Sequence, residues 1–442
     1  MATQLLKVAK FGGSSLSDPP RFKGAADIIK AQEERKFVVV SAPGKRFSGD
    51  EKVTDLLYAC YEHAQNKNDK KFEETFGKIR ERYLILRDAL CPDYNIEEEL
   101  DGVYASFKRR LGKDHAASRG EYLCGRLMAA CLGFPFIDPA DCVFFKDDGS
   151  FDAEKTNDAL SSRLRAQGCG VIPGFYGSMP NDTIRTFTRG GSDITGSLVA
   201  RAVGADLYEN WTDVDGFLMA DPRIVESPKV MESVTYRELR ELSYMGATVL
   251  HEDSVVPVRM AGIPILIKNT TNPSAAGTMI LPRRDGDDAP VITGIAGRKG
   301  FSAITVEKDM MNGEIGFCRK ILEVLEENHV NFEHLPTGID GISVVAPTAQ
   351  LEGKRAKVLN SICRAANPEC AYIEDEIALI AIVGSGISGN LKALSTIFDA
   401  LAGAKIPVLI TNRCMAENNA IVGVSEQHFE EAIRAIYAAF NP

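Results

Sequence analysis

LLKVAKFGGSS, at residues 5–15, is a short apolar run that ends in two glycines and two serines. Such a run predicts a buried β-strand that leads into a tight turn. We expect a helix to follow around residues 21–36 and a second buried strand at residues 37–40. The chain therefore opens with a β-turn-α-β arrangement, which is typical of a parallel sheet covered by helices.

A helical insertion interrupts this alternation. At about residues 50–112 apolar side chains recur at helical spacing among many charged ones, which predicts helices. Alternation then resumes, with helices expected at residues 118–132, 155–166 and 192–203 and strands at residues 136–137, 171–172, 184–187 and 206–211. The α/β pattern favours a three-layer αβα domain with a mostly parallel central sheet at residues 1–297.

The last third of the chain contains an internal repeat at an offset of 76 residues, in which Ile304 matches Ile380. A charged segment flanked by prolines, at residues 282–290, precedes the repeat and is the best candidate for a linker. Each copy has the size of a ferredoxin-like βαββαβ unit. The expected boundaries are residues 298–442 for the region, about 309–374 and 375–442 for its two units, and 301–307 for a strand that could join the second unit.

Composition excludes several classes of protein. The 442 residues carry 51 Lys and Arg against 61 Asp and Glu, a formal charge of -10, so we expect no nucleic acid among the partners. The ten cysteines stand far apart without a C-x-x-C pair, which favours reduced thiols over zinc sites or disulfides. No apolar run has the length of a signal peptide or a membrane span. We therefore expect a cytoplasmic protein that contacts no membrane.

The turn after the first strand indicates phosphate chemistry. A P-loop is not supported, because no G-x-x-x-x-G-K-[ST] motif is present. At this turn, Gly12 and Gly13 let backbone amides approach an anion, and Ser14 adds a hydroxyl. Lys10 supplies a positive charge for a phosphoryl group. Taken alone, a glycine pair after a strand is more often a plain turn, and Lys10 could extend towards solvent.

A second glycine-rich turn, TRGGSD at residues 188–193, lies between an expected strand and an expected helix. Its Arg189 could hold a carboxylate through two parallel hydrogen bonds. The alternatives are a helix start capped by Ser192 or Asp193 and an ion pair between Arg189 and Asp193. Carboxylates and an arginine follow in WTDVDG at residues 211–216 and ADPR at residues 220–223.

Two other motifs have ordinary structural explanations. SRGE at residues 118–121 could present Glu121 to a ligand, but Ser118 and Glu121 also have the spacing of a capping box at a helix start. G-x-G-x-x-G at residues 384–389 has the spacing of a dinucleotide fingerprint, yet no acidic residue closes the following strand. We therefore interpret the latter motif as a turn within the second repeat.

Together and in this order, KFGGSS, SRGE, RGGSD and WTDVDG through ADPR resemble the motifs of aspartokinases, of the amino-acid kinase superfamily. The resemblance covers nearly the whole chain, because aspartokinases also end in a pair of ACT domains. It implies the amino-acid kinase fold followed by two ferredoxin-like ACT domains. The implied activity is the ATP-dependent phosphorylation of the L-aspartate side-chain carboxylate to 4-phospho-L-aspartate, the first step towards lysine, threonine and methionine.

The resemblance also implies roles for individual residues. The implied catalytic residues are Lys10, which would neutralise the transferring phosphoryl group, and Asp193. The implied ATP and phosphate contacts are Lys10, Gly12, Gly13, Ser14, Thr212, Asp213 and Arg223. The implied aspartate contacts are Ser41, Thr54, Glu121 for the α-ammonium, Arg189 for a carboxylate, Gly190, Gly191 and Ser192. The implied cofactor is Mg²⁺ carried by ATP, without a direct cage of protein ligands.

One position departs from the family. Many members have a nucleotide-contacting lysine in F-G-A-K-V-L-H, whereas this chain reads MGATVLH at residues 245–251, with Thr248 in its place. Thr248 cannot supply that charge, so the contact with ATP is either absent or replaced. A buried, hydrogen-bonded role is the ordinary expectation for His251.

The ACT-like repeat implies a regulatory amino acid, lysine or threonine or both, and a homodimer or a dimer of dimers. The candidate effector contacts are Gly313, Glu314, Gly316, Phe317, Asn331 and Glu333. Without the resemblance, Gly313 and Gly316 would be read as loop glycines. Two alternatives to an aspartate kinase stay open: another amino-acid kinase, resembling glutamate 5-kinase or acetylglutamate kinase, and a non-catalytic amino-acid sensor.

Overall fold

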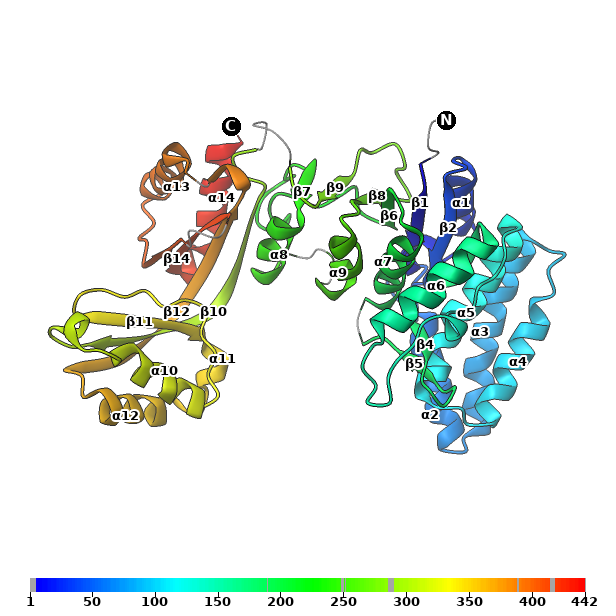
Figure 1. Ribbon diagram of the computed structural model, residues 1–442, viewed down its shortest axis with the longest axis horizontal. Coiled ribbons are helices and arrows are strands. Elements are labelled where there is room, and N and C mark those ends of the chain that lie inside the picture. The colour runs from blue at the N-terminus through cyan, green and yellow to red at the C-terminus, as the bar shows by residue number, and fades with distance from the viewer. Residues whose placement is uncertain are drawn as a thin grey trace. The chain divides into compact units, whose positions relative to one another are not determined.

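The computed structural model describes residues 5–188, 190–247, 250, 252–284, 290–387, 389–413 and 418–441. The chain divides into two compact units (Figure 1). The first unit comprises Met1–Phe217, Glu232–Tyr236 and Val249–Arg283, and the second comprises Leu218–Met231, Arg237–Thr248 and Arg284–Pro442. Two segments that precede the boundary expected near residue 297 therefore belong to the second unit.

A seven-stranded sheet runs through the first unit in the order β3-β2-β1-β6-β8-β9-β7. Its strands are β1 (Lys7–Phe11), β2 (Arg35–Val40), β3 (Gly170–Pro173), β6 (Leu207–Thr212), β7 (Ser233–Thr235), β8 (Ile265–Asn269) and β9 (Thr278–Leu281). Neighbouring strands are parallel, except that β8 and β9 are antiparallel. The mostly parallel central sheet is thus confirmed.

Two of the expected strands do not extend this sheet. β5 (Ile184–Thr186) pairs with β4 (Tyr176–Ser178) in a separate two-stranded antiparallel sheet. The strand expected at residues 136–137 is reduced to a bridge between Phe136 and Val171.

Helices cover both faces of the central sheet. The helices of the first unit are α1 (Pro19–Lys30), α2 (Val53–Gln65), α3 (Asp69–Leu90), α4 (Ile96–Lys108), α5 (Lys113–Leu132), α6 (Ala153–Gln167), α7 (Gly191–Val203) and α9 (Glu252–Ala261). Successive side chains of a strand point to opposite faces. Ala9 and Phe11 therefore face the core that β1 shares with α1 to α5, whereas Lys10 pairs with Asp193 of α7. This arrangement confirms the three-layer αβα architecture.

The boundaries of two helices differ from the expected ones. α1 ends at Lys30 rather than near residue 36, because the chain turns there and Arg35 begins β2. α5 begins at Lys113 rather than at residue 118, directly after Gly112, whose φ of 106° requires glycine.

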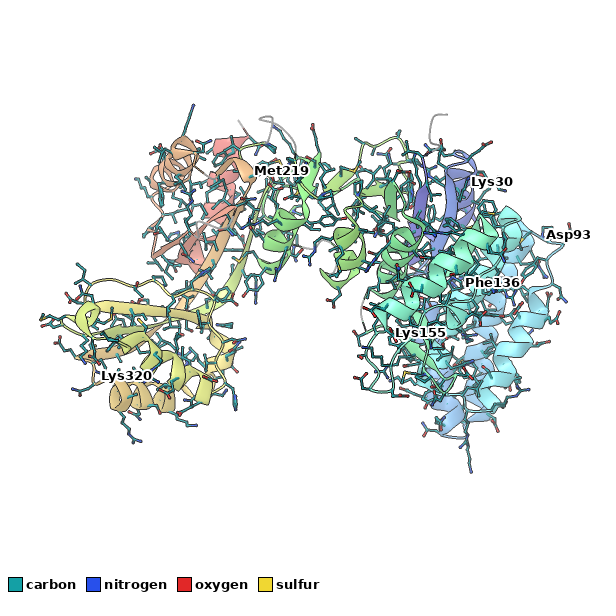
Figure 2. The ribbon with its side chains drawn as sticks, in the orientation of Figure 1. Lys30, Asp93, Phe136, Lys155, Met219 and Lys320 are labelled. Atoms are coloured by element: carbon teal, nitrogen blue, oxygen red, sulfur yellow. The ribbon has the colours of Figure 1, made fainter. Side chains whose placement is uncertain are left out.

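Helices α2, α3 and α4 form the helical insertion expected at residues 50–112 (Figure 2, in which Asp93 marks the connection between α3 and α4). Its core is aromatic. Phe72 and Phe76 of α3 contact Tyr104 and Phe107 of α4, with ring centroids 5.3 to 6.1 Å apart. Because these rings recur at helical spacing, the pattern that predicted helices also identified their buried faces.

The second unit is built on a five-stranded sheet in the order β11-β10-β12-β14-β13. Its strands are β10 (Gly294–Glu307), β11 (Gly341–Pro347), β12 (Cys370–Val383), β13 (Ile410–Asn412) and β14 (Asn419–Ser425). Its helices are α8 (Tyr236–Tyr244), α10 (Phe317–Glu327), α11 (Thr348–Leu351), α12 (Arg355–Ala366), α13 (Leu391–Gly403) and α14 (Phe429–Phe440). All pairs within the sheet are antiparallel.

The two repeats share the long strands β10 and β12. Residues 301–307 of β10 pair with β11 and with the first part of β12, within the first repeat. Residues 294–298 of β10 pair instead with residues 379–383 of β12, within the second repeat. The part of β10 that belongs to the second repeat is therefore at residues 294–298 and not near residues 301–307.

The glycines of G-x-G-x-x-G lie in a packed turn, as the turn interpretation predicts. A Cβ added to Gly386 would lie 2.6 Å from the Cα of Val291, and one added to Gly384 would lie 2.5 Å from the carbonyl oxygen of Val291. These positions are thus restricted to glycine by the neighbouring backbone. Within the described part of the chain, none of the helices has the length and apolar character of a membrane span.

Candidate active site

Sequence motifs from distant parts of the chain meet at one edge of the central sheet. The carboxyl ends of parallel strands lie at the same edge, where ligands bind in open α/β sheets. Gly12 to Ser14 follow β1, Ser41 follows β2, Thr212 and Asp213 lie at the end of β6, and Thr270 follows β8. Thr54 lies in the first turn of α2, after the segment that Ser41 begins.

Lys10 is buried at the end of β1 and forms an ion pair with Asp193. Its Nζ lies 2.5 Å from Oδ1 of Asp193, and only 7% of the residue is exposed. Asn210, which lies beside Lys10 on β6, donates from Nδ2 to the same oxygen at 2.8 Å. Lys10 therefore does not extend into solvent, and Asp193 is held by two donors.

Asn210 was not identified from the sequence. It and Glu209 are polar residues in the middle of a buried strand, and this is the signal that could have marked it.

The glycine turn after β1 packs against the segment after β2. The amide of Gly44 donates to the carbonyl of Gly13 at 2.7 Å, and a Cβ on either glycine would lie 2.7 Å from backbone atoms of the other segment. The amide of Gly12 donates to the carbonyl of Trp211 at 3.1 Å, so it continues the sheet and is not available to an anion. In the described part of the chain the amides of Gly13 and Ser14 have no such partner.

Glu121 is buried against the same segment. Its carboxylate accepts a hydrogen bond from the backbone of Ala42, while Oε2 has no partner among the described residues. Burial raises the pKa of Glu121 to about 7, although the bond from Ala42 and the charge of Arg119 act in the opposite direction. A buried carboxylate oxygen without a partner is suited to receive an ammonium group from a ligand.

The capping-box interpretation of Ser118 and Glu121 is wrong. Both residues lie inside α5, whose first residue is Lys113, and the Ser118 hydroxyl donates to the carbonyl of His115 at 2.8 Å. The helix continues through this point because nothing between Lys113 and Ser118 breaks it.

The start of α7 lies next to the ends of β2 and β3. Gly174, which follows β3, donates its amide to the carbonyl of Val40, and a Cβ on it would lie 2.6 Å from the Cα of Ser192. Gly190 has a φ of 58° and precedes α7, in which Gly191 is the first residue. Arg189, Thr248 and His251 lie outside the described residues.

The residues assigned to the nucleotide divide between the two units. Thr212 donates to Asp213 at 3.2 Å, and its carbonyl accepts from the hydroxyl of Thr270, which also bonds Ser15 at 2.8 Å. Arg223 belongs to the second unit, where its Nη2 lies 2.6 Å from Asp221. Within the first unit, Thr212 and Asp213 thus lie near the glycine turn after β1, to which Thr270 links them.

The candidate effector residues lie in the first repeat, with Gly313, Glu314, Gly316 and Phe317 at the start of α10 and Asn331 and Glu333 after its end. Glu314 already pairs with Lys308 at 2.5 Å and with Lys320 of α10 at 2.6 Å (Figure 2 labels Lys320). Glu333 accepts a hydrogen bond from the Tyr244 hydroxyl. Gly313 and Gly316 lie in the turns before α10, and Phe317 is buried in the core of this repeat.

Asn331 lines a cavity of about 600 Å³ beside α10. Its other walls include Glu326, His329 and Phe332. The amide of Asn331 donates to Oε1 of Gln350 at 2.6 Å, which joins the two sides of the cavity.

Comparisons with known proteins agree with this geometry. The amino acid kinase family matches residues 6–269, and an ACT domain matches residues 380–440. Aspartokinase 3 of Bacillus subtilis is 36% identical over 452 residues, which cover 98% of each chain. The crystal structure of the aspartate kinase of Clostridium acetobutylicum, described as an allosteric enzyme, superposes with a TM-score of 0.90 at 46% identity, over 99% of this chain and 100% of that one.

A more distant structure shares the fold alone. E. coli aspartokinase III in complex with aspartate and ADP has a TM-score of 0.71 at 22% identity, over 99% of this chain and 100% of that one. With both domain types matched and a full-length relative well above 30% identity, the chain belongs to the aspartokinases, within the amino acid kinase family.

Proposed function

We propose that the protein transfers the γ-phosphoryl group of ATP to the side-chain carboxylate of L-aspartate, giving ADP and 4-phospho-L-aspartate. The observation that carries this proposal is the buried Lys10, followed by a turn in which the amides of Gly13 and Ser14 have no partner in the part of the chain that the structure describes. The same turn contacts the segment that bonds Glu121. One edge of the sheet thus offers a site for a phosphoryl group and a site for an amino acid.

The aspartate site is assigned to residues from four segments. Glu121 would hold the α-ammonium group, because its Oε2 is buried and has no partner among the described residues. Arg189, Gly190, Gly191 and Ser192 at the start of α7 would bind a carboxylate, with Ser41 and Thr54 on the facing segment. The reacting carboxylate is ionised at pH 7 and needs no general base, so catalysis depends on positioning and on charge.

The phosphate site is assigned to Lys10, Gly13 and Ser14, with Thr212 and Asp213 on the nucleotide side. Lys10 would neutralise charge on the phosphoryl oxygens in the transition state, and Asp193 would orient Lys10. Gly12 would shape the turn, because its amide bonds the sheet. The family resemblance also assigns Arg223 to the nucleotide.

The residues fit a Mg²⁺ ion that is carried by ATP. Among the described residues no three acidic, histidine or cysteine side chains gather into a metal cage. Mg²⁺ commonly binds substrate phosphates, water and one or two carboxylates, which Asp193 or Asp213 could supply. When bound, the ion would neutralise phosphate charge.

A hydroxamate assay of the purified protein tests the activity, because hydroxylamine traps the acyl phosphate product. We expect hydroxamate with aspartate and ATP, and none with glutamate or N-acetylglutamate. Turnover of glutamate instead would indicate the other amino-acid kinases. No turnover with any of them would indicate a non-catalytic sensor, which the buried Lys10–Asp193 pair argues against.

We further propose that lysine, threonine or both inhibit the enzyme through the ACT repeats. The cavity beside Asn331 supports a site in the first repeat. A homodimer or a dimer of dimers and a cytoplasmic location complete the proposal. Calorimetric titration with each amino acid, followed by the inhibition assay, tests the regulation. The proposal fails if neither amino acid produces heat or inhibition.

A further inference from the structure

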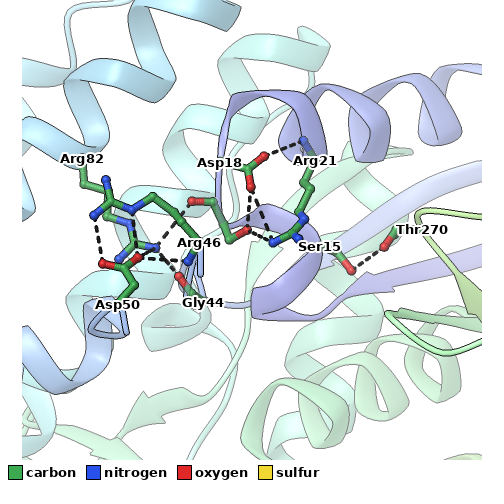
Figure 3. Close-up of polar contacts among 9 residues, drawn as sticks. Ser15, Asp18, Arg21, Gly44, Arg46, Asp50, Arg82 and Thr270 are labelled. Atoms are coloured by element: carbon green, nitrogen blue, oxygen red, sulfur yellow. Dashed lines mark hydrogen bonds and ion pairs between the residues drawn. The ribbon is translucent and has the colours of Figure 1, made fainter. Parts of the chain in front are cut away.

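Arg82, in the middle of α3, contacts two turns that contribute to the proposed active site. One is the turn after β1, which ends at Ser17, and the other is the segment after β2, which contains Gly44 and Glu51. Only 4% of its side chain is exposed. Nη1 donates to the carbonyl of Glu51 at 2.7 Å. Nη2 donates to the carbonyl of Gly44 (Figure 3). A longer contact of 3.5 Å joins Nη2 to the carbonyl of Ser17.

Each of these carbonyls lies close to a residue assigned to the site. Gly44 donates its own amide to Gly13, so the carbonyl that Arg82 bonds belongs to the residue that supports the phosphate turn. Ser17 directly follows the short helix at Gly13–Leu16, which contains Ser14. Glu51 lies two residues before α2, whose first turn carries Thr54.

The charge of Arg82 is compensated by a carboxylate that is itself fixed. Nη2 lies 3.4 Å from Oδ2 of Asp50, which is 9% exposed. Asp50 also accepts from Nε and Nη2 of Arg46 at 2.8 and 2.9 Å (Figure 3). Burying a cation costs free energy that a hydrophobic side chain of similar size would not cost. We therefore interpret Arg82 as a residue that fixes the geometry of its partners and not as one that mainly stabilises the fold.

We propose that Arg82 is a positioning residue of the kinase: its guanidinium holds the carbonyls of Gly44, Glu51 and Ser17 so that both turns keep one arrangement around the substrates. A guanidinium presents its donors in a rigid planar fork, whereas an ammonium group is a compact point charge on a flexible stem. The neighbouring Tyr83 donates its hydroxyl to the carbonyl of Gly120 at 2.6 Å, next to Glu121. One turn of the insertion therefore supports both the phosphate side and the aspartate side of the site.

The proposal rests on the kinase activity proposed above. It predicts that substitution of Arg82 lets the two turns move and so misplaces the substrates. Arg82→Lys and Arg82→Gln, in the full chain, should lower kcat/KM for aspartate by about 10- to 100-fold, because small misplacements of substrate have effects of this size. Hydrogen exchange should become faster at residues 13–18 and 41–52 and stay unchanged in α4. Arg80→Gln is the matched control, since Arg80 lies on the same helix and pairs at the surface with Asp101.

Three outcomes are distinguishable. Wild-type kcat/KM and unchanged exchange in both Arg82 variants would overturn the proposal. Faster exchange throughout the insertion, with activity lost in proportion to thermal stability, would also overturn it, because it indicates a purely structural role. If the wild-type protein lacked aspartate kinase activity, the proposed function would fail, and the exchange experiment would still test whether Arg82 holds the two turns.

Discussion

Burial raises the pKa of Glu121, which we assign to the α-ammonium group of aspartate. Its pKa of about 7 means that the free enzyme loses the carboxylate just below neutral pH. An ammonium group binds the charged form, so kcat/KM for aspartate at saturating ATP should fall about tenfold per pH unit below pH 7. The measurement is a pH profile between pH 5 and 9. Glu121→Gln should show a low, flat profile, and a wild-type profile without this titration would contradict the assignment.

The same group should make stability depend on pH. The pKa of Glu121 is higher in the folded protein than its ordinary value of 4.5, so folding favours the protonated form. The free energy of unfolding should therefore decrease by roughly 3 kcal/mol as pH rises from about 4.5 to about 7. Glu121→Gln does not titrate and should become more stable than wild type across this range. Urea unfolding of both proteins at pH 4 and pH 8 checks this. If the difference in free energy of unfolding between Glu121→Gln and wild type were the same at both pH values, the prediction would be refuted.

Local sequence identified most site residues individually but not their partners. Lys10 and Asp193 stood in separate glycine-rich motifs, and their 2.5 Å pairing depends on the packing of α7 against β1. Asn210 escaped notice because its role follows from strand register. Arg82 could not be found in this way, since its partners are backbone carbonyls, which carry no sequence signal.

At the scale of elements, the paired glycines fix how closely two turns approach. A Cβ on Gly44 would lie 2.7 Å from the carbonyl carbon of Gly13, closer than packed atoms allow. Gly44→Ala should therefore separate the turns and lower kcat/KM by about tenfold or more. Steady-state kinetics with both substrates measures the effect.

Gly102→Ala is the control for this prediction. Gly102 lies inside α4 with open space around its Cα, so alanine should stabilise the protein by about 0.5–1 kcal/mol and leave activity unchanged. Equal kinetics for Gly44→Ala and Gly102→Ala would mean that the contact between the turns is not needed for catalysis.

The predicted elements were most accurate where one periodicity extended over many residues. The aromatic spacing of α3 and α4 and the apolar runs of β1 and β2 identified both the elements and their buried faces. Two strands occur where they were expected, but their pairing was not anticipated, because tertiary contacts decide it. β5 pairs with β4 outside the central sheet, and the expected strand at residues 301–307 is part of β10, which continues through both repeats.

At the scale of the whole molecule, segments from the middle of the chain are part of the C-terminal unit. Ala220 and Val225 belong to the same core as Ile380 and Ile436. Glu238 of α8 is fully buried and pairs with Nη1 of Arg284 at 2.8 Å. The boundary expected near residue 297 missed these segments, because it was inferred from a linker-like composition, which does not show which segments contact one another.

Glu238→Ala should destabilise the second unit by about 3–5 kcal/mol, because it removes a fully buried carboxylate that accepts hydrogen bonds from Arg284, Thr293 and Ser385. Hydrogen exchange of β12 and the amide of Ser385, which donates to Glu238, reports the loss. Glu430→Ala is the comparison, since Glu430 is half exposed and lies 3.6 Å from Lys299, and we expect a change within about 0.5 kcal/mol. Similar effects of both substitutions would show that α8 is not anchored through Glu238.

In the proposed mechanism, Lys10 neutralises charge on the phosphoryl group and Glu121 binds aspartate. The most direct test measures aspartate affinity by calorimetry and kcat by the hydroxamate assay in Lys10→Met, with Lys7→Met on the same strand as control. We predict wild-type aspartate affinity with kcat lowered about 10²- to 10³-fold in Lys10→Met. Wild-type kcat in Lys10→Met, or a loss of aspartate binding that accounts for the whole defect, would contradict the account.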